Sequence, residues 1–261
     1  MNTAVDVRRL DVAALETKVK AMYREVALKP DADFHFEMGR GLADRLGYLP
    51  SDLDAVPAHA IASFAGVGYY FDLAGLRPGE RVVDLGSGSG MDSFVAALKV
   101  GPEGRVIGVD MTDEQLDKAE QLRRAAGIAH VEYRKAYVQQ TGLPEASADL
   151  VISNGVINLV PDKRAVFREA ARLLKPGGRI ALADIVTEKQ LSDGITGDAT
   201  LWAACIGGAM QEDGYVAEIE AAGLRVQERR DNPQYLFISE NAQGAATKFG
   251  VKSISLVARK D

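Results

Sequence analysis

The sequence has a single cysteine, Cys205, among its 261 residues, so it cannot form an internal disulfide. Its first residues also lack the apolar stretch of a secretion signal. Because disulfides are rare in reducing compartments, the two absences together predict a cytoplasmic protein. No apolar run approaches the roughly 20 residues that span a bilayer, so we expect no membrane partner.

Positive charge is also scarce, since 31 Lys and Arg oppose 37 Asp and Glu and leave a net charge of −6. This balance argues against a general nucleic-acid binder, although a local basic patch stays possible. The apolar fraction of 47% and the charged fraction of 26% are ordinary for a soluble globular protein. The length suits one large α/β domain with a small appendage. We expect a monomer or homodimer with a small-molecule substrate, no nucleic-acid partner and no metal site.

The most informative stretch runs from Arg81 to Asp92 and reads RVVDLGSGSGMD. Apolar residues around Asp84 predict a buried parallel strand. The three glycines that follow permit a sharp turn and a close approach of the backbone to a ligand. The helix expected from Met91 then presents free N–H groups at the same place. The stretch therefore predicts a ligand site at a strand-to-helix turn.

Two classes of ligand use such a turn. A dinucleotide fold requires the spacing G-x-G-x-x-G, whereas the spacing here is G-x-G-x-G and Met91 replaces the third glycine of that fingerprint. The carboxylate of Asp84 would repel a pyrophosphate but would suit the cationic amino-acid end of a ligand. These features favour S-adenosylmethionine (SAM) over a dinucleotide.

Polar residues follow the next predicted strands as well. Asp110 ends the second strand, where a carboxylate can accept hydrogen bonds from both ribose hydroxyls of an adenosine or can cap the next helix. Tyr137 and Val138 follow the third strand, where they flank an adenine or lie at the surface. Asn154 follows the fourth strand and either meets the methionine part of SAM or the substrate, or forms a turn. The predicted cofactor site comprises Asp84, Gly86, Ser87, Gly88, Gly90, Asp92, Asp110, Met111, Thr112, Gln115, Tyr137, Val138 and Asn154.

Strands and helices alternate from about residue 80, which predicts a parallel sheet with crossover helices. Thr112 and Gln115 have the spacing of a capping box, and Pro176–Gly178 is predicted to end a helix and turn into the next strand. The predicted strands are Arg81–Leu85, Arg105–Asp110, Val131–Arg134, Leu150–Ser153, Ile180–Asp184, Leu224–Arg230 and Ser253–Arg259. The predicted helices of this part are Met91–Lys99, Asp113–Ala126, Lys163–Leu174 and Gly214–Ala222.

Two segments depart from this alternation. The first 80 residues read as helices at about Asp11–Ala27 and Phe34–Leu46, with a loop at Leu49–Pro57. The other segment, Ile185–Asp213, leaves a strand end and contains Trp202 and two adjacent glycines. Insertions at the carboxyl ends of parallel strands lie over the ligand crevice. We therefore expect residues 1–75 to form a helical lid on a cofactor-binding domain of residues 76–261, with a substrate-covering insertion at about 185–213.

The predicted catalytic residues are Tyr70, Cys205 and His35, and Trp202 is a further candidate on the substrate side. His35 is either a general base tuned to neutral pH or a histidine on a helix surface. Tyr70, with its neighbour Tyr69, precedes the first strand, where a tyrosine either rests on the cofactor or packs in the core. Cys205 is either a substrate-side thiol or a small buried hydrophobic residue.

Together these residues resemble the class I SAM-dependent methyltransferases and, more closely, the arsenite methyltransferase family. The resemblance implies a Rossmann-like α/β fold with a seven-stranded sheet, SAM as the cofactor and methyl transfer as the reaction. It extends from about Leu46 to the C-terminus. It rests on the stretches Asp84–Asp92, Gly108–Thr112, Ser153–Lys163 and Cys205–Ala209, of which the last two are the most particular to the family.

The resemblance also implies where the acceptor binds. Members of the family hold trivalent arsenic in cysteine thiolates, and Cys205 matches one of these cysteines. Val67 stands at a second cysteine position, and Lys252–Leu256 offers no thiol near the last strand, where the third lies. One thiolate cannot build a three-coordinate arsenic site, so we expect an organic acceptor in an altered pocket. The alternatives are a metalloid or thiol methyltransferase that uses Cys205, an enzyme that cleaves or cyclises SAM, and a SAM sensor without turnover.

Overall fold

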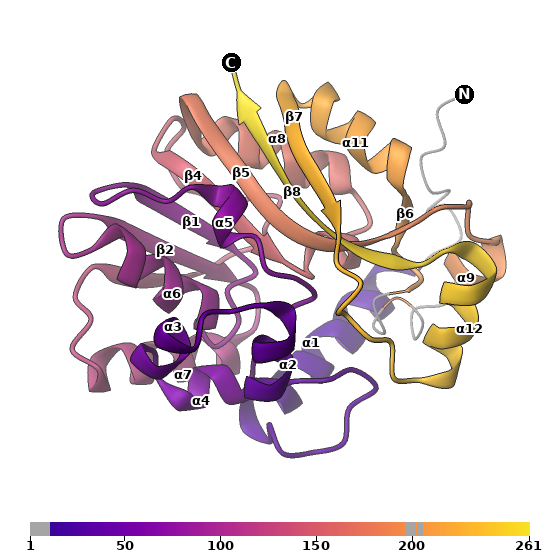
Figure 1. Cartoon of the computed structure of the whole chain (residues 1–261), viewed down its shortest axis with the longest axis horizontal. Helices are drawn as coiled ribbons and strands as arrows, with labels where there is room; N and C mark the ends of the chain where they lie inside the picture. Colours follow the sequence, from indigo (N-terminus) through magenta and orange to yellow (C-terminus); the bar gives the residue numbers. More distant parts are fainter. Residues whose placement is uncertain (1–10, 197–201, 203–205) are drawn as a thin grey trace.

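A computed structural model of the chain describes residues 11–196, 202 and 206–261. At its centre lies a sheet with the strand order β3-β2-β1-β4-β5-β8-β7, and a short β6 pairs with β5 off this path (Figure 1). β8 runs antiparallel to β5 and β7, whereas the other pairs are parallel. The strands are β1 (Arg81–Leu85), β2 (Arg105–Asp110), β3 (Val131–Lys135), β4 (Ala148–Asn154), β5 (Leu174–Thr187), β6 (Met210–Gln211), β7 (Leu224–Asp231) and β8 (Lys252–Lys260).

The middle of the sheet is apolar because it is covered on both faces. Every residue of β1 after Arg81 is buried, and β4 is buried along most of its length. Helices α6 and α7 pack on β1, β2 and β3, whereas α8 and α11 pack on β4, β5 and β7. The predicted α/β class is thus confirmed, with β6 as an addition to the seven expected strands. The helices of this part are α6 (Met91–Val100), α7 (Asp113–Ala125), α8 (Lys163–Leu173), α9 (Asp193–Thr196), α11 (Glu212–Ala221) and α12 (Glu240–Phe249), with a 3-10 turn η2 (Ile157–Leu159).

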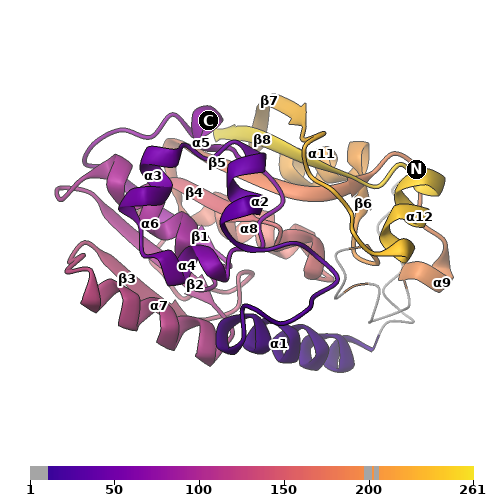
Figure 2. The same ribbon diagram turned by 60° about the horizontal axis from the view of Figure 1, so that its bottom comes forward.

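The N-terminal part is helical, and its longest helix, α1, packs against α7 (Figure 2). The helix predicted over Phe34–Leu46 begins only at Gly39, after an extended Met38, and Phe34 and Phe36 stack on each other in the irregular segment before it. The loop predicted at Leu49–Pro57 was wrong, since Pro50 starts a short helix at a position that needs no N–H donor. The helices of this part are α1 (Val12–Leu28), α2 (Gly39–Leu46), α3 (Pro50–Ala55), α4 (Ala58–Ala62) and α5 (Phe71–Ala74).

Strand β5 and helix α12 also differ from the prediction. β5 begins at Leu174, so Pro176–Gly178, predicted as a turn, lies within the strand, beside a shift in register against β4. Helix α12 was not predicted, although its ends carry recognisable signals. Ser239 caps its first turn through its hydroxyl, and Gly250 ends it in the left-handed conformation.

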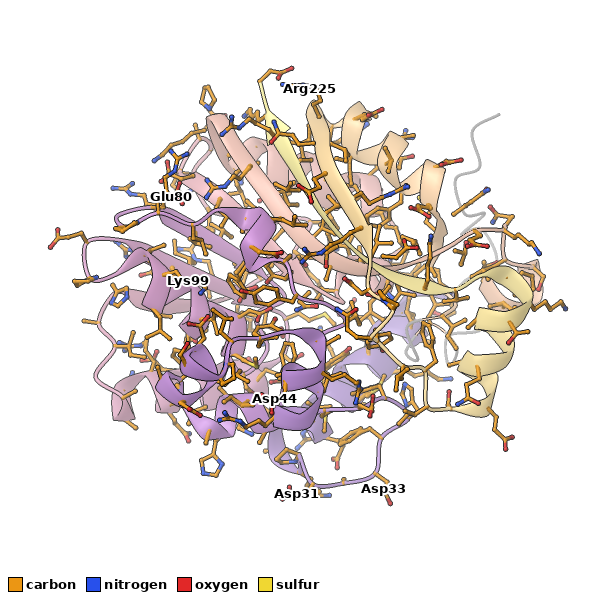
Figure 3. All side chains as sticks on the ribbon, viewed as in Figure 1. Asp31, Asp33, Asp44, Glu80, Lys99 and Arg225 are labelled. Atoms are coloured by element: carbon orange, nitrogen blue, oxygen red, sulfur yellow. The ribbon has the colours of Figure 1, made fainter. Side chains whose placement is uncertain are left out.

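Charged side chains such as Asp31, Asp33 and Arg225 project from the periphery of the molecule (Figure 3). Within the described parts of the chain, every helix is too short or too polar to cross a membrane. The capping box predicted at Thr112 and Gln115 was wrong, because neither side chain caps α7. The Gln115 side chain instead contacts Ser89 and the backbone of Tyr23.

Candidate functional site

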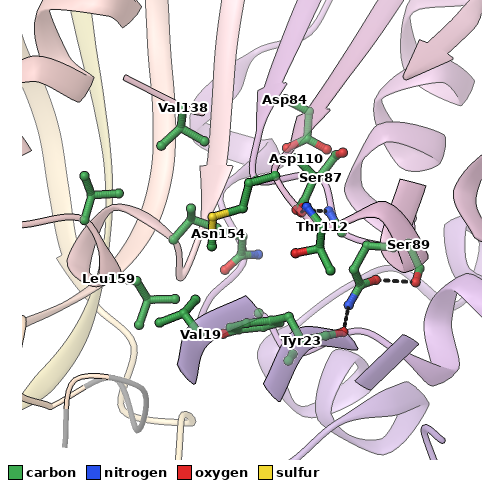
Figure 4. Close-up of a pocket in the computed structure, with 18 of the residues that line it drawn as sticks. Val19, Tyr23, Asp84, Ser87, Ser89, Asp110, Thr112, Val138, Asn154 and Leu159 are labelled. Atoms are coloured by element: carbon green, nitrogen blue, oxygen red, sulfur yellow. Dashed lines mark hydrogen bonds between the residues drawn. The ribbon is translucent and has the colours of Figure 1, made fainter. Parts of the chain in front are cut away.

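The glycine turn between β1 and α6 forms one wall of a cavity at the carboxyl ends of the parallel strands (Figure 4). Gly86 and Gly90 both have left-handed backbone angles, with φ of 79° and 92°. A β-carbon would collide with the side chain of Val156 at Gly86 and with the hydroxyl of Tyr133 at Gly90. Glycine is therefore required at these two positions both by conformation and by space.

The cavity gathers residues from segments that are far apart in the sequence. Helix α1, the segment around Phe64, the strand ends and the residues after η2 all contribute to it. The described residues that line it are Val12, Leu15, Glu16, Val19, Tyr23, Ala60, Ser63, Phe64, Ala65, Gly66, Asp84, Gly86, Ser87, Gly88, Ser89, Met91, Asp92, Asp110, Met111, Thr112, Gln115, Tyr137, Val138, Gln139, Asn154, Val156, Leu159, Val160 and Pro161. Of the predicted cofactor residues, all but Gly90 are in this set; Gly90 lies within the same turn, as the N-cap of α6.

Asp84 lies at the end of β1 with its carboxyl group buried. One of its oxygens accepts a hydrogen bond from the Ser93 hydroxyl at 2.6 Å. Burial, together with the nearby charge of Asp92, raises the pKa of Asp84 to about 8. A cation beside this carboxyl would oppose both effects, so the site is suited to a positively charged ligand group.

Asp110 at the end of β2 connects the glycine turn to the start of α7. Its two carboxylate oxygens accept hydrogen bonds from the backbone N–H of Gly88 at 3.0 Å and of Thr112 at 2.8 Å. Burial raises the pKa of Asp110, and these hydrogen bonds oppose the shift. Each oxygen keeps a further lone pair, so the carboxylate can still accept a hydrogen bond from a ligand hydroxyl.

Asp92, in the first turn of α6, is the centre of a buried hydrogen-bond network. It accepts from the hydroxyls of Tyr48 at 2.6 Å and Tyr70 at 2.8 Å. The side-chain amide of Asn154 donates to it at 3.0 Å. Burial raises the pKa of Asp92, and the three donors oppose the shift. This network joins the N-terminal part of the chain to α6 and β4.

The side chain of Asn154 forms hydrogen bonds with several groups of the protein. Its oxygen accepts from the Val67 N–H at 2.8 Å, and its amide also donates to the carbonyl of Gly68 at 3.0 Å. The side chain thus fastens residues 67–68 to the end of β4. The predicted contact of Asn154 with SAM or the substrate stays a prediction, and its side chain has a structural role as well.

Tyr137 and Gln115 link α1 to the cofactor side of the cavity. The Tyr137 hydroxyl donates to Glu16 and accepts from Lys20, and its ring is 41% exposed. Gln115 donates to the backbone carbonyl of Tyr23 at 2.7 Å. Both residues therefore hold α1 against the strand ends.

Of the three predicted catalytic residues, the two that the structure describes, Tyr70 and His35, are not among the lining residues of the cavity. Tyr70 is fully buried and donates its hydroxyl to Asp92, which agrees with the alternative of a tyrosine packed in the core; its catalytic role stays a prediction. His35 packs edge-on against Phe36, with ring centroids 4.8 Å apart, and is not one of the lining residues. Cys205 lies outside the described residues.

Val67 is buried behind the cavity, against the last two strands of the sheet. Its carbonyl accepts a hydrogen bond from the Ser253 hydroxyl at 2.6 Å. The Ser255 hydroxyl donates to the carbonyl of Tyr69 at 2.9 Å, and Asn232 donates to both serines. Hydroxyl and amide groups thus fill the space between Val67 and β8 and bind the backbone there.

The sequence did not reveal the contribution of α1 to the cavity. Leu15, Val19 and Tyr23 line it from successive turns of the helix. Their four-residue spacing is an apolar stripe that marks a buried face without saying what the face covers. Phe64 and the residues that follow η2 were also missed, because their position depends on the tertiary fold.

Comparison with known proteins gives a consistent result. A family model described as a methyltransferase domain matches residues 76–228. The chain is 39% identical to an arsenite methyltransferase of Halobacterium salinarum over 186 residues, which cover 71% of this chain and 47% of that protein. It is 44% identical to one of Aquipseudomonas alcaligenes over 142 residues, which cover 52% of this chain and 41% of that protein. The matched part thus spans about half the length of these curated relatives, or less.

Solved structures show the same fold. An arsenic(III) S-adenosylmethionine methyltransferase of Chlamydomonas reinhardtii matches with a TM-score of 0.63 and 29% identity, over 85% of this chain and 74% of that chain. A geranyl diphosphate C-methyltransferase of Streptomyces coelicolor matches with a TM-score of 0.70 and 17% identity, over 96% and 99% of the two chains. The second likeness concerns the fold alone.

Proposed function

We propose that this chain, which belongs to the methyltransferase domain family and has the class I SAM-dependent methyltransferase fold, transfers the methyl group of SAM to a small organic molecule. SAM is the cofactor of this class. The observation that carries the proposal is the single cavity in which the glycine turn, Asp84 and Asp110 meet an apolar wall. It offers a polar half for the cofactor and an enclosed half for an acceptor.

The polar half has a group for each charged or polar part of SAM. Asp84 would lie near the ammonium group, and the free N–H groups at the start of α6 would face the carboxylate. Asp110 would accept hydrogen bonds from the ribose hydroxyls, while Met111 and Val138 supply apolar surface for the adenine. These assignments are proposals that follow from position and chemistry.

Methyl transfer is an in-line displacement at the sulfonium methyl, so the protein's main task is to align the acceptor atom and exclude water. Alignment alone can supply roughly 7–11 kcal/mol of the barrier. The proposal therefore needs no general base among the described residues. We propose that residues 1–75 act as the lid that encloses the reactants, since α1 lines the cavity.

Methylation of arsenite is the second candidate, and the identity with arsenite methyltransferases favours it. Two observations argue against arsenite. Val67 and the serines of β8 offer no thiol at the positions where the family has two of its cysteines. The Ser253 hydroxyl is already bound to the Val67 carbonyl and to Asn232. Only Cys205 could act as an arsenic ligand, with external thiols to complete the coordination. We therefore favour an organic acceptor.

Product analysis with methyl-labelled SAM separates these functions. The proposal predicts S-adenosylhomocysteine as the coproduct and the label in an organic compound. Saturable formation of methylarsenic from arsenite and glutathione would instead establish the second candidate. Methylthioadenosine would indicate cleavage of the aminobutyl chain, and tight SAM binding without any product would indicate a sensor.

A further inference from the structure

The cavity is divided into two halves of different polarity (Figure 4). Asp84, Asp110 and Thr112 lie together on the side of the glycine turn. Val19 and Leu159 lie on the other side and belong to a wall of apolar side chains. The wall consists of the apolar lining residues of α1, of Phe64 and of the segment at the end of η2, namely Val12, Leu15, Val19, Phe64, Leu159, Val160 and Pro161.

Within the described part of the chain, the lining of the cavity includes no lysine, arginine or histidine. Three aspartate carboxylates face the same space, those of Asp84 and Asp92, which are buried, and that of Asp110, which is half-buried. An anionic acceptor would therefore lose its hydration without gaining a counterion from a described lining side chain.

Two lysines that hydrogen-bond to lining residues are also bound to other groups. Lys20 pairs with Glu16 at 2.5 Å and also bonds the Tyr137 hydroxyl. Lys118 donates to the carbonyl of Ala27 at 3.0 Å and to the hydroxyl of Ser63 at 2.8 Å. Among the described lining residues, Glu16 is the acid that belongs to α1, and it is paired with Lys20, so a cationic acceptor finds no unpaired described acid beside the apolar wall.

The part of the apolar wall at the end of η2 is stabilised by contacts of its backbone with buried groups. Lys163 is buried and donates to the carbonyls of Asn158 and Val160, each at 3.1 Å, while its ammonium lies 4.9 Å from the centre of the Trp202 ring. A β-carbon at Gly208 would collide with the carbonyl of Asn158. The backbone of η2 is thus fixed, and the Leu159–Pro161 segment keeps its apolar side chains in the cavity.

We infer that the acceptor is an uncharged, mainly apolar molecule bound between α1 and the Leu159–Pro161 segment. That this molecule accepts a methyl group rests on the proposed function, whereas its binding to the apolar wall does not depend on methyl transfer. The apolar wall can select a ligand by its charge and polarity, and these two properties define the class of the acceptor.

The test measures binding of three probes of equal chain length to the complex with S-adenosylhomocysteine. Ligand-observed NMR would compare hexan-1-ol, hexanoate and hexylammonium at neutral pH. Hexan-1-ol is expected to bind at least about tenfold more tightly than hexanoate, and also more tightly than hexylammonium. Equal or tighter binding of either ion, or no binding of hexan-1-ol at its solubility limit, would overturn the inference.

A charge placed in the wall gives an independent arm. Val160→Lys should weaken hexan-1-ol and strengthen hexanoate, so that their order reverses. Val12→Lys, at a position that is 47% exposed, repeats the test where folding is less at risk. Leu98→Lys is the matched control on the surface of α6, and it should leave the order of the probes unchanged. An unchanged order in both wall variants, with S-adenosylhomocysteine still bound, would contradict the inference.

The outcome is independent of the proposed function. If no acceptor is methylated but hexan-1-ol is preferred, the proposed function fails and the apolar site stands. If S-adenosylhomocysteine forms with an anionic acceptor, methyl transfer stands and the inference fails.

Discussion

At the scale of single residues, the cavity-lining carboxylates of Asp84, Asp92 and Asp110 differ in the number of hydrogen bonds that they accept from the protein. Asp92 accepts from two tyrosines and an amide, and Asp110 accepts from two backbone N–H groups. Asp84 accepts from the Ser93 hydroxyl, and its pKa is raised to about 8. Donors stabilise the ionised form, so Asp84 gains most from a cationic ligand group.

The raised pKa of Asp84 predicts a dependence of stability on pH. Between the ordinary value of 3.8 and about 8, the folded protein keeps a proton that the unfolded chain releases. The free energy of unfolding should therefore fall as the pH rises through this window, by an amount on the order of a few kcal/mol. Urea unfolding at a series of pH values would compare the protein with Asp84→Asn. Parallel pH profiles for the two proteins would refute the assignment.

Asp110→Ala should weaken SAM binding by roughly 1–3 kcal/mol if the carboxylate holds the ribose. Isothermal calorimetry measures this directly. Asp113→Ala, a change of an exposed acid in the next helix, is the control and should have little effect. Unchanged SAM affinity in the Asp110 variant would show that this carboxylate serves only the backbone of residues 88 and 112.

Tyr70→Phe should lower the free energy of unfolding by about 1–3 kcal/mol, because it removes one donor from buried Asp92. The rate of methyl transfer in the folded variant should change little, since the Tyr70 hydroxyl does not face the cavity. Tyr69→Phe is the neighbouring control and should affect stability less. A large loss of turnover with unchanged stability would support the catalytic role that the sequence suggested for Tyr70.

At the scale of elements, the sequence predicted best where local signals and tertiary structure agree. β1 and β2 were predicted with their observed bounds, since continuous apolar runs next to glycine or aspartate mark the central strands. β5 was predicted too short at its start, because Leu174 also pairs with β4, on the far side of an irregularity in register that contains Pro176–Gly178. The positions of the predicted cofactor residues along the cavity follow from strand ends, whereas the wall from α1 depends on packing that no local pattern encodes.

A substitution of Lys163 tests whether its ammonium stabilises the backbone of η2. Burial lowers the pKa of Lys163 to about 8, and its neighbour Asp184 is also buried, with a pKa raised to about 6. Lys163→Met would leave two carbonyls without their donor and Asp184 without its counter-charge, so stability should fall by about 3 kcal/mol or more. Chemical denaturation would measure it. Arg164→Met, which removes only an ion pair with Glu218, should cost much less, and an equal cost would contradict this role.

At the scale of the whole molecule, the cavity lies between the carboxyl ends of the strands and the N-terminal part of the chain, which contributes α1, Ala60 and residues 63–66 to the lining. Helix α1 is held to α7 and the strand ends by the exposed contacts of Tyr137, by the buried Gln115 and by its own apolar face. Exposed contacts such as those of Tyr137 contribute little individually, and α1 lines the cavity, so we propose that α1 opens for ligand exchange.

Hydrogen exchange should reveal this behaviour. Without ligand, the amides of α1 should exchange faster than those of β1 and β4, and S-adenosylhomocysteine should slow them several-fold. Helix α12, which contributes no residue to the described lining, serves as the internal reference and should not respond. Equal protection of α1 with and without the ligand would argue against its role as a lid.

The most direct test of the account follows the methyl group itself. Purified protein would be given methyl-labelled SAM with a solvent extract of small molecules from its source cells, and in parallel with arsenite and glutathione. The account predicts S-adenosylhomocysteine and a labelled, uncharged organic product in the first reaction, with negligible methylarsenic in the second. Saturable formation of methylarsenic, with no label in an organic compound, would contradict it.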